Sequence, residues 1–330
     1  MQEYGVFTLF LFSIVVYNTV LLYGTVGEIL TEKAGSLNLG VEGTMAVGAI
    51  FGYLAGVSTN NLWIGLVGAF IAGGLCGLLF AFLTVSLQAN QNVTGLTITT
   101  FGLGLYFFVG KGFGSNWPAL QSAPDVVAAY AAVPIPVLSS LPMVGKAFFS
   151  HSVLVYLGVL IAVGIWWYMK YTKTGLKLRA VGENPSAADS VGININLYKY
   201  IHIIIGSGIM GLGGYYMALV MGGSFEGSTC WINGYGWISI ALVIFANWNP
   251  VMAILGSLVF GFFNTLQVYS GSLANSFPES LGWLSGIPAQ LYQALPFLIT
   301  AIVLIASSIR QKDGEGGPAA LGVNYFREER

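Results

Sequence analysis

The stretch TGLKLRAVGENPSAADSVG, residues 174–192, is a polar passage between two long apolar runs. Asn184 followed by Pro185 indicates the start of a helix, because Asn is a good N-cap and Pro at the first helical position lacks only an N–H that would have no intrahelical partner. Residues 186–190 extend this helix for roughly two turns, and Gly192 provides its end. The stretch therefore predicts a short, polar-faced helix at a membrane surface. An ordinary loop carrying a surface helix is the simpler interpretation of the same pattern.

The rest of the chain has the composition of a membrane protein. Of its 330 residues, 55% are hydrophobic and only 8% are charged, against about 25% charged residues in a soluble domain. Runs of roughly 20 apolar residues recur, and the alternating segments of about ten residues that are typical of a transmembrane β-barrel are not found. We therefore predict an all-α, polytopic transmembrane bundle of about nine spans, within a range of roughly 8–10. The expected spans are roughly residues 6–23, 44–57, 62–87, 93–110 (after a polar hinge at 90–92), 152–169, 200–221, 238–246, 251–269 and 287–307.

Two glycine-rich passages interrupt this apolar pattern, AGSLNLGVEG at residues 34–43 and GGSFEGSTCW at residues 222–231. Paired broken helices in the two halves of a transporter indicate a binding site near the bilayer midplane. The two passages share only a few residues, so the repeat is weak. Elsewhere, Gly73 and Gly77 form a GxxxG pattern, which is typical of closely packed membrane helices.

Basic residues gather in two places, and these places predict the orientation in the membrane. Five of the 12 Lys and Arg lie at positions 170, 173, 177, 179 and 199, and four more lie at 310, 312, 327 and 330. Both places are expected to be cytoplasmic by the positive-inside rule. We therefore divide the chain into a transmembrane domain at 1–309, with an extracytoplasmic loop at 111–150 and a cytoplasmic loop at 170–199, and a flexible cytoplasmic tail at 310–330.

The sequence offers little support for catalysis. The segment 206–211 matches G-x-G-x-x-G, but it lies inside a run long enough to span the membrane, so small residues that allow helices to approach are the better explanation. There is no P-loop, and His151 and His202 are isolated. Cys76 and Cys230 are the only cysteines, and we expect neither a structural disulfide nor a metal site.

Polar residues in or near the spans are candidates for lining a solute pathway. An ionised side chain at mid-bilayer costs about 2.5–3.5 kcal/mol, so Glu28, Glu32, Lys33 and Glu42 must pair, face water or lie near an interface. Uncharged amides and hydroxyls could bind a neutral solute, although hydrogen bonds between helices are the better explanation for any single one. The candidate pathway-lining residues are Asn38, Glu42, Asn92, Thr94, Asn247, Asn264 and Gln267.

Four stretches resemble one family of transport proteins. They are EKAGSLNLGVEGTMAVGA (32–49), NQNVTGLTITTFGLGL (90–105), GLKLRAVGENPSAADSVGIN (175–194) and IFANWNPVMAILGSLVFG (244–261). Together they resemble the membrane permease subunits of bacterial ABC importers, in the nucleoside and simple-sugar branch related to the ribose and branched-chain amino acid permeases. The resemblance follows the order of the chain over nearly its whole length, but the 111–150 loop matches nothing in it.

The resemblance implies an importer subunit that forms half of a pore in the bacterial cytoplasmic (inner) membrane, with its C-terminus in the cytoplasm. Its implied partners are ATP-binding cassette subunits, a second and related permease chain, an extracytoplasmic solute-binding protein and membrane lipid, and no nucleic acid. No cofactor is implied in this chain, because ATP and magnesium bind the partner subunits. The residues that match the cytoplasmic coupling helix are Glu183, Asn184, Pro185, Ser186, Ala187, Ala188 and Asp189.

Two other classes of function remain as alternatives. A stand-alone secondary transporter or facilitator of a small polar solute would be favoured by titratable residues spread along several spans, whereas here they cluster in one passage. A membrane-embedded enzyme would require a catalytic set, and the sequence supplies none that is evident. The solute is expected to be a nucleoside or a related simple sugar, and branched-chain amino acids are not excluded.

Overall fold

The computed structural model describes residues 2–114, 130, 132–136, 138–141, 144–220, 230–288 and 316–326, together with isolated positions between 290 and 305. All regular secondary structure in these ranges is helical. The chain begins with α1 (Gln2–Lys33) and continues through α2 (Val41–Thr59) and α3 (Leu62–Ala81), which passes into a π-helical turn (Phe82–Ser86). The helices that follow are α4 (Gln91–Gly114), α6 (Val144–Phe148), α7 (Val153–Tyr171), α8 (Lys173–Glu183), α9 (Pro185–Ser190), α10 (Ile195–Val220), α11 (Tyr235–Phe245), α12 (Pro250–Ser276) and α13 (Pro278–Leu281).

Seven of the described helices are long and apolar enough to cross a membrane: α1, α2, α3 with its π-helical turn, α4, α7, α10 and α12. The all-helical prediction is confirmed, but the expected count of nine spans is not. The seventh expected span corresponds to α11, which has 11 residues and is too short by itself to cross a bilayer. The ninth, at residues 287–307, lies largely outside the described residues.

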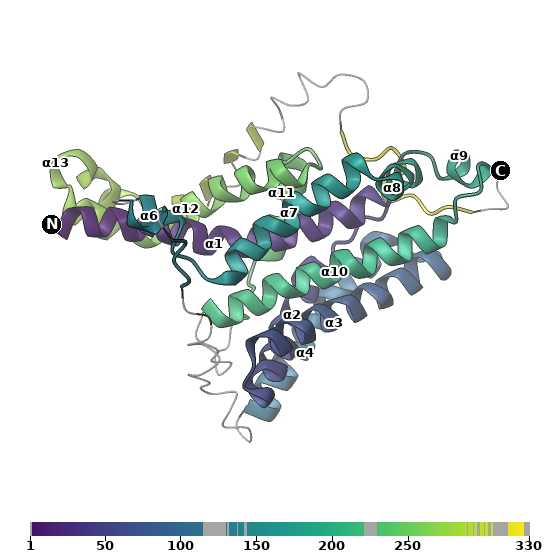
Figure 1. Cartoon of the computed structure of the whole chain (residues 1–330), viewed down its shortest axis with the longest axis horizontal. Coiled ribbons are helices and arrows are strands. Elements are labelled where there is room, and N and C mark those ends of the chain that lie inside the picture. Colours follow the sequence, from purple (N-terminus) through teal and green to yellow (C-terminus); the bar gives the residue numbers. More distant parts are fainter. Residues whose placement is uncertain are drawn as a thin grey trace.

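Helix α1 lies at the centre of the bundle. It packs against α10 and α12 along much of its length, and also against α11 and α7 (Figure 1). Every residue from Val20 to Leu30 is buried. Helices α2, α3 and α10 pack against one another, and α4 packs on α2. The bundle therefore has a core that is formed by α1, α2 and α10 and enclosed by the other helices.

Small residues allow the helices to approach closely where α3 meets α10. A Cβ atom built on Gly73 would lie 3.0 Å from the Cα atom of Gly211, and one built on Gly77 would lie 2.6 Å from the Cβ atom of Ser207. Gly208, from the G-x-G-x-x-G segment, faces the ring of Phe70 in the same interface. Without a hydrophobic driving force between helices in lipid, such van der Waals contact is a main source of association. The structure thus supports a packing role for both glycine patterns.

The first glycine-rich passage forms a buried turn between α1 and α2. Gly35 has a φ of +79°, a left-handed conformation that favours glycine. The turn residues are all buried or half-buried. The second passage falls mostly in residues 221–229, outside the described residues, so the expected pair of broken helices is not confirmed.

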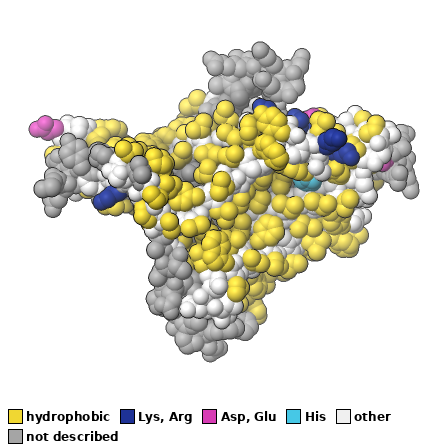
Figure 2. All heavy atoms as spheres, viewed as in Figure 1, with side chains coloured by type: hydrophobic (Ala, Val, Ile, Leu, Met, Phe, Trp, Pro, Cys, Tyr) yellow, Lys and Arg dark blue, Asp and Glu magenta, His cyan; other side chains and the backbone are white. Residues whose placement is uncertain are grey.

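The surface divides into a broad apolar band and two more polar ends. Figure 2 shows hydrophobic side chains covering the middle of the molecule, with Lys and Arg gathered at the end that carries α8. Residues 2–14 of α1, α6 and α13 lie toward the opposite end (Figure 1). We call the end that carries α8 and α9 the basic end. An apolar band of this kind suits a position in lipid.

Candidate functional site

The basic end presents two short helices, each capped by a side chain, of which the sequence predicted only the second. The hydroxyl of Thr172 accepts a hydrogen bond from the Gly175 N–H at 3.0 Å at the start of α8, and the Asn184 side chain accepts one from the Ala187 N–H at 3.0 Å at the start of α9. Pro185 occupies the first turn of α9, and Gly192 has a φ of +82° just beyond its end. The predicted helix at residues 185–190 is therefore confirmed as a structural element.

Helix α9 packs on the bundle through one buried apolar side chain, and most of its other side chains are exposed. Ala188 is buried in a small cluster with Val181 of α8 and Ile195 of α10. Exposed around it are Glu183, Asn184, Ser186, Ala187 and Ser190. The exposed basic residues Lys173, Lys177 and Arg179 lie on the adjoining α8. The two helices thus form an exposed ledge that could bind another protein.

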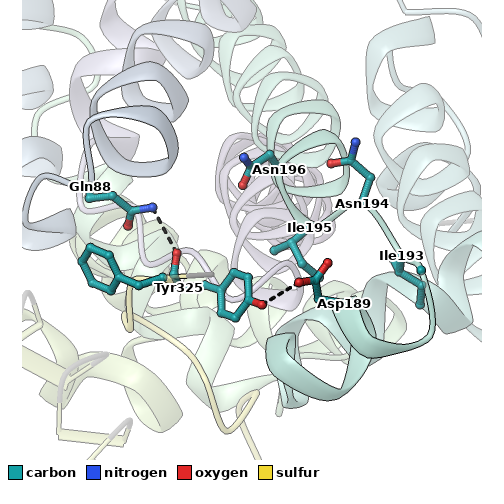
Figure 3. A pocket seen from close by; sticks show the side chains of 9 residues that line it. Gln88, Asp189, Ile193, Asn194, Ile195, Asn196 and Tyr325 are labelled. Atoms are coloured by element: carbon teal, nitrogen blue, oxygen red, sulfur yellow. Dashed lines mark hydrogen bonds between the residues drawn. The ribbon is translucent and has the colours of Figure 1, made fainter. Parts of the chain in front are cut away.

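A polar pocket of about 550 Å³ adjoins this ledge. Its walls include Gln88, Asp189 and Tyr325, which come from three separate parts of the chain (Figure 3). The Tyr325 hydroxyl donates a hydrogen bond to Asp189 Oδ2 at 2.8 Å, and Gln88 Nε2 donates one to the Tyr325 carbonyl at 3.1 Å. The sequence predicted a flexible tail at 310–330 and did not predict these contacts of Tyr325. No local sequence signal links residue 325 to residues 88 and 189.

Two of the candidate pathway residues, Asn38 and Glu42, hold backbone in place. The Asn38 N–H donates to Glu28 Oε1 at 3.0 Å, and Asn38 Oδ1 accepts from the Gly40 N–H at 2.8 Å. The two carboxylate oxygens of Glu42 accept hydrogen bonds from the N–H groups of Gly234 and Gly236, at 2.7 and 2.8 Å. Glu42 therefore binds the N-terminus of α11, where a negative charge is favoured.

The other candidates occupy different environments. Thr94 is buried and donates to the Asn90 carbonyl at 2.8 Å, whereas Asn92 is exposed at the start of α4. Asn247 is exposed in the turn between α11 and α12, with a φ of +49°. Asn264 and Gln267 are half-buried, one turn apart on α12, and Asn264 Nδ2 donates to the Tyr235 hydroxyl at 2.7 Å.

Glu42 and Asn264 are both linked to the start of α11, although they lie on different helices. Glu42 binds the N–H groups on either side of Tyr235, and Asn264 binds the hydroxyl of Tyr235 itself. The seven candidates are otherwise not gathered into a single cluster. Within the described part of the chain, no group of three or more His, Cys, Asp or Glu is arranged to hold a metal ion.

The buried acids of α1 also have structural partners. Glu28 and Glu32 lie one turn apart and are both buried. Glu32 accepts a hydrogen bond from the indole N–H of Trp248, in the turn between α11 and α12. Glu28 accepts from the backbone of the 34–40 turn, as described above. These acids therefore connect α1 to two turns of the chain.

The described helices form an apolar bundle with an exposed ledge at its basic end, and comparison with known proteins identifies the family. Residues 10–304 match the family described as the branched-chain amino acid transport system permease component. The chain belongs to this family. It is accordingly a multi-pass membrane protein and a permease component of an ABC transporter, and the family in general works with an ATPase and a binding protein.

Three relatives match over nearly their whole length. The chain is 34% identical to the putative glucose ABC transporter permease protein TsgC13 of Haloferax volcanii, covering 94% of this chain and 95% of that one. It is 31% identical to the nucleoside ABC transporter permease protein NupC of Lactococcus lactis, covering 96% of each. It is 32% identical to the guanosine ABC transporter permease protein NupQ of Bacillus subtilis, covering 96% of this chain and 95% of that one. No solved structure matches the chain.

Proposed function

We propose that this chain is the permease subunit of an importer for nucleosides or related simple sugars, and that it forms half of a translocation pathway with a second, related permease. The observation that carries the proposal is the similarity over 96% of the chain to relatives described as nucleoside and guanosine permeases. The similarity to a putative glucose permease supports the wider class of hydroxyl-rich, neutral solutes. The solute then crosses by alternating access, driven by ATP hydrolysis on the partner ATPase.

In this proposal, residues 183–189 are the contact through which the ATPase acts. This assignment is supported by the exposed ledge at the basic end, formed by α8 and α9, each of which begins with a side-chain N-cap. Ala188 fixes α9 on the bundle, so a displacement of α9 is passed to α10 through Ile195. Packed helices transmit such displacements as rigid bodies because closely packed interfaces have few intermediate arrangements.

The proposed pathway residues are the seven polar candidates, with Asn264 and Gln267 of α12 best placed among them. Both are half-buried, uncharged and able to donate and accept hydrogen bonds, as a sugar or nucleoside requires. Glu42 in addition holds the start of α11 in place by accepting hydrogen bonds from the Gly234 and Gly236 N–H groups. This keeps Tyr235 within hydrogen-bond distance of Asn264.

The deciding experiment is uptake by proteoliposomes that contain this chain, its partner permease, the ATPase and the binding protein. Radiolabelled guanosine, glucose and leucine are offered separately, each with ATP or with ADP. We expect ATP-dependent uptake of guanosine or glucose, abolished when the ATPase or the binding protein is omitted. Uptake by this chain alone and without ATP would replace the importer by a facilitator, and uptake of leucine alone would refute the proposed solute class.

The proposed contact is tested by deleting residues 185–190. We expect the deleted chain to insert normally but to lose co-purification with the ATPase, because α9 supplies the contact surface. Asp189→Arg should weaken the same interaction by charge reversal. Co-purification unchanged by the deletion would show that the ATPase binds elsewhere.

A further inference from the structure

Residues 316–326, which follow the last helical positions described, cross the basic end and contact five separate parts of the protein. Gly317 lies against the ring of Trp248, in the turn between α11 and α12. The segment then meets the end of α8, the 34–40 turn, the connection between α3 and α4, and finally α9. Such an extended segment has no packed interior of its own, so its position depends on these contacts.

At the end of α8, the segment supplies two backbone N–H donors, one to a terminal carbonyl and one to a carboxylate. The Ala320 N–H donates to the Gly182 carbonyl at 3.0 Å, and the Ala319 N–H donates to Glu183 Oε2 at 3.1 Å. The last carbonyls of a helix have no intrahelical partner, so these bonds satisfy groups that would otherwise need water. The segment is therefore bound to the residue that directly precedes the cap of α9.

At its other end, the segment joins α9 to the connection between α3 and α4. Tyr325 bonds to Asp189 through its hydroxyl and to Gln88 through its carbonyl, so one residue bridges the two elements (Figure 3). Asn324 Nδ2 donates to the Gln88 carbonyl at 2.7 Å and to the Ala89 carbonyl at 3.2 Å. Gln88 has a φ of +56°, a conformation uncommon outside glycine, which these bonds stabilise.

From this connection the contacts continue into the 34–40 turn. Gln91 Nε2 donates to Asn324 Oδ1 at 3.0 Å, while Gln91 Oε1 accepts from the Leu37 N–H at 2.8 Å. The Gly322 N–H also donates to the Gly35 carbonyl at 3.3 Å. Hydrogen bonds joined through the neighbouring residues Asn324 and Tyr325 therefore connect Asp189 on α9 to the 34–40 turn and to Gln91, the first residue of α4.

From these contacts we infer that residues 316–326 are a positioning element that couples α9 to α2 and α4. The inference rests on the proposed function, because it assigns a route by which displacement of α9 reaches the spans. In the wild-type protein, a displacement of α9 moves Tyr325 through its hydrogen bond to Asp189. Asn324 then transmits this displacement to the connection between α3 and α4 and to Gln91. The apolar cluster around Ala188 contains Val181 of α8 and Ile195 of α10, and the half-buried ring of Tyr325 packs against it, so Tyr325 contacts α9 through its ring as well as through its hydroxyl.

The test uses the complete transporter in proteoliposomes, with uptake and ATP hydrolysis measured on the same preparation. The variants are a chain truncated after residue 315, the double substitution Asn324→Ala with Tyr325→Phe, and Tyr325→Phe alone. The matched control is Tyr156→Phe, which also removes one tyrosine hydroxyl. That hydroxyl accepts a hydrogen bond from the His151 N–H at 3.1 Å, at the end of α7 opposite to α8. Insertion and co-purification with the ATPase are measured for each variant.

We expect the truncated and doubly substituted chains to bind the ATPase and hydrolyse ATP at the wild-type rate, with solute carried per ATP reduced at least about fivefold, the lower end of typical coupling between sites. Tyr325→Phe alone should reduce the ratio by less, and Tyr156→Phe should leave it unchanged. If the truncated chain fails to insert, the double substitution decides the question.

Wild-type coupling in the double-substituted chain would overturn the inference. Loss of ATPase binding would also overturn it, because the segment would then be part of the binding surface and not a link behind it. Failure of the proposed function is distinguishable, since the wild-type transporter itself would then show no uptake that depends on ATP.

Discussion

Glu42 binds two backbone N–H groups with a single buried carboxylate, and we expect this side chain to determine the stability of α11. Glu42→Ala leaves the Gly234 and Gly236 donors without an acceptor, at a cost of about 2–4 kcal/mol. Thermal unfolding in detergent should show a clear fall in Tm, with Glu42→Gln intermediate because one acceptor remains. Glu279→Ala is the matched control, since Glu279 is exposed. Equal Tm values for the Glu42→Ala and Glu279→Ala variants would contradict the assignment.

His151 makes stability depend on pH. It lies just before α7, stacked on Phe12 with 4.3 Å between ring centroids, and Nε2 is 2.8 Å from the Ala147 carbonyl oxygen. Burial lowers its pKa below the usual 6.5, an effect that exceeds the opposing one of the hydrogen bond to Ala147. The unfolded chain therefore takes up a proton first as the pH falls, so the stabilisation is present above pH 6.5 and is lost below it.

We accordingly expect Tm to fall between pH 7.5 and pH 5.5, and to fall less in a His151→Gln variant. The comparison between the two proteins isolates this histidine from the other titratable groups. An identical pH dependence in both would show that His151 does not contribute.

At the scale of helices, the closest packing predicts which small substitutions are damaging. Gly73→Ala adds a methyl group that would meet Ser207 and Gly211 of α10, so α3 and α10 must separate. Overpacking of this kind costs about 1–3 kcal/mol. Gly104→Ala on α4 has no atom within 4 Å of the added carbon and gains up to about 1 kcal/mol of helix propensity. We expect Tm to fall in the Gly73→Ala variant and not in the Gly104→Ala variant. An equal fall in Tm in both variants would argue against helix packing as the cause.

The sequence predicted those elements whose signals are local. The Asn184–Pro185 start and the Gly192 end define α9, and each acts on backbone within a few residues. Long apolar runs likewise identified the principal spans, because burial in lipid requires only length and composition. Contacts between residues distant in the sequence have no such local signal. Tyr325 and Asp189 are 136 positions apart, and the polar segment that contains Tyr325 has no periodic pattern from which its contacts could be predicted. The same limit applies to Asn38 and Glu42, whose bonds are to backbone.

At the scale of the whole molecule, the basic end and the apolar band together predict an orientation in the membrane. The exposed Lys and Arg of α8 lie beside the band, where the positive-inside rule places cytoplasmic residues (Figure 2). A comparison of the two ends of α7 does not depend on the number of spans elsewhere. Of the helices between residues 138–141 and α9, α7 is the one long and apolar enough to cross a membrane, so we expect these two places to face opposite sides.

Cysteine labelling tests this orientation directly. Ser140 and Ser186 are both exposed, and the native thiols Cys76 and Cys230 are 6% and 7% exposed, so they give little background. Burial also raises the pKa of Cys230 to about 12, which keeps its reactive thiolate scarce. A membrane-impermeant maleimide added to intact cells should label Ser140→Cys, and should label Ser186→Cys only after permeabilisation. Labelling of Ser186→Cys in intact cells would place α9 outside, out of reach of a cytoplasmic ATPase, and would refute its proposed role together with that of residues 316–326.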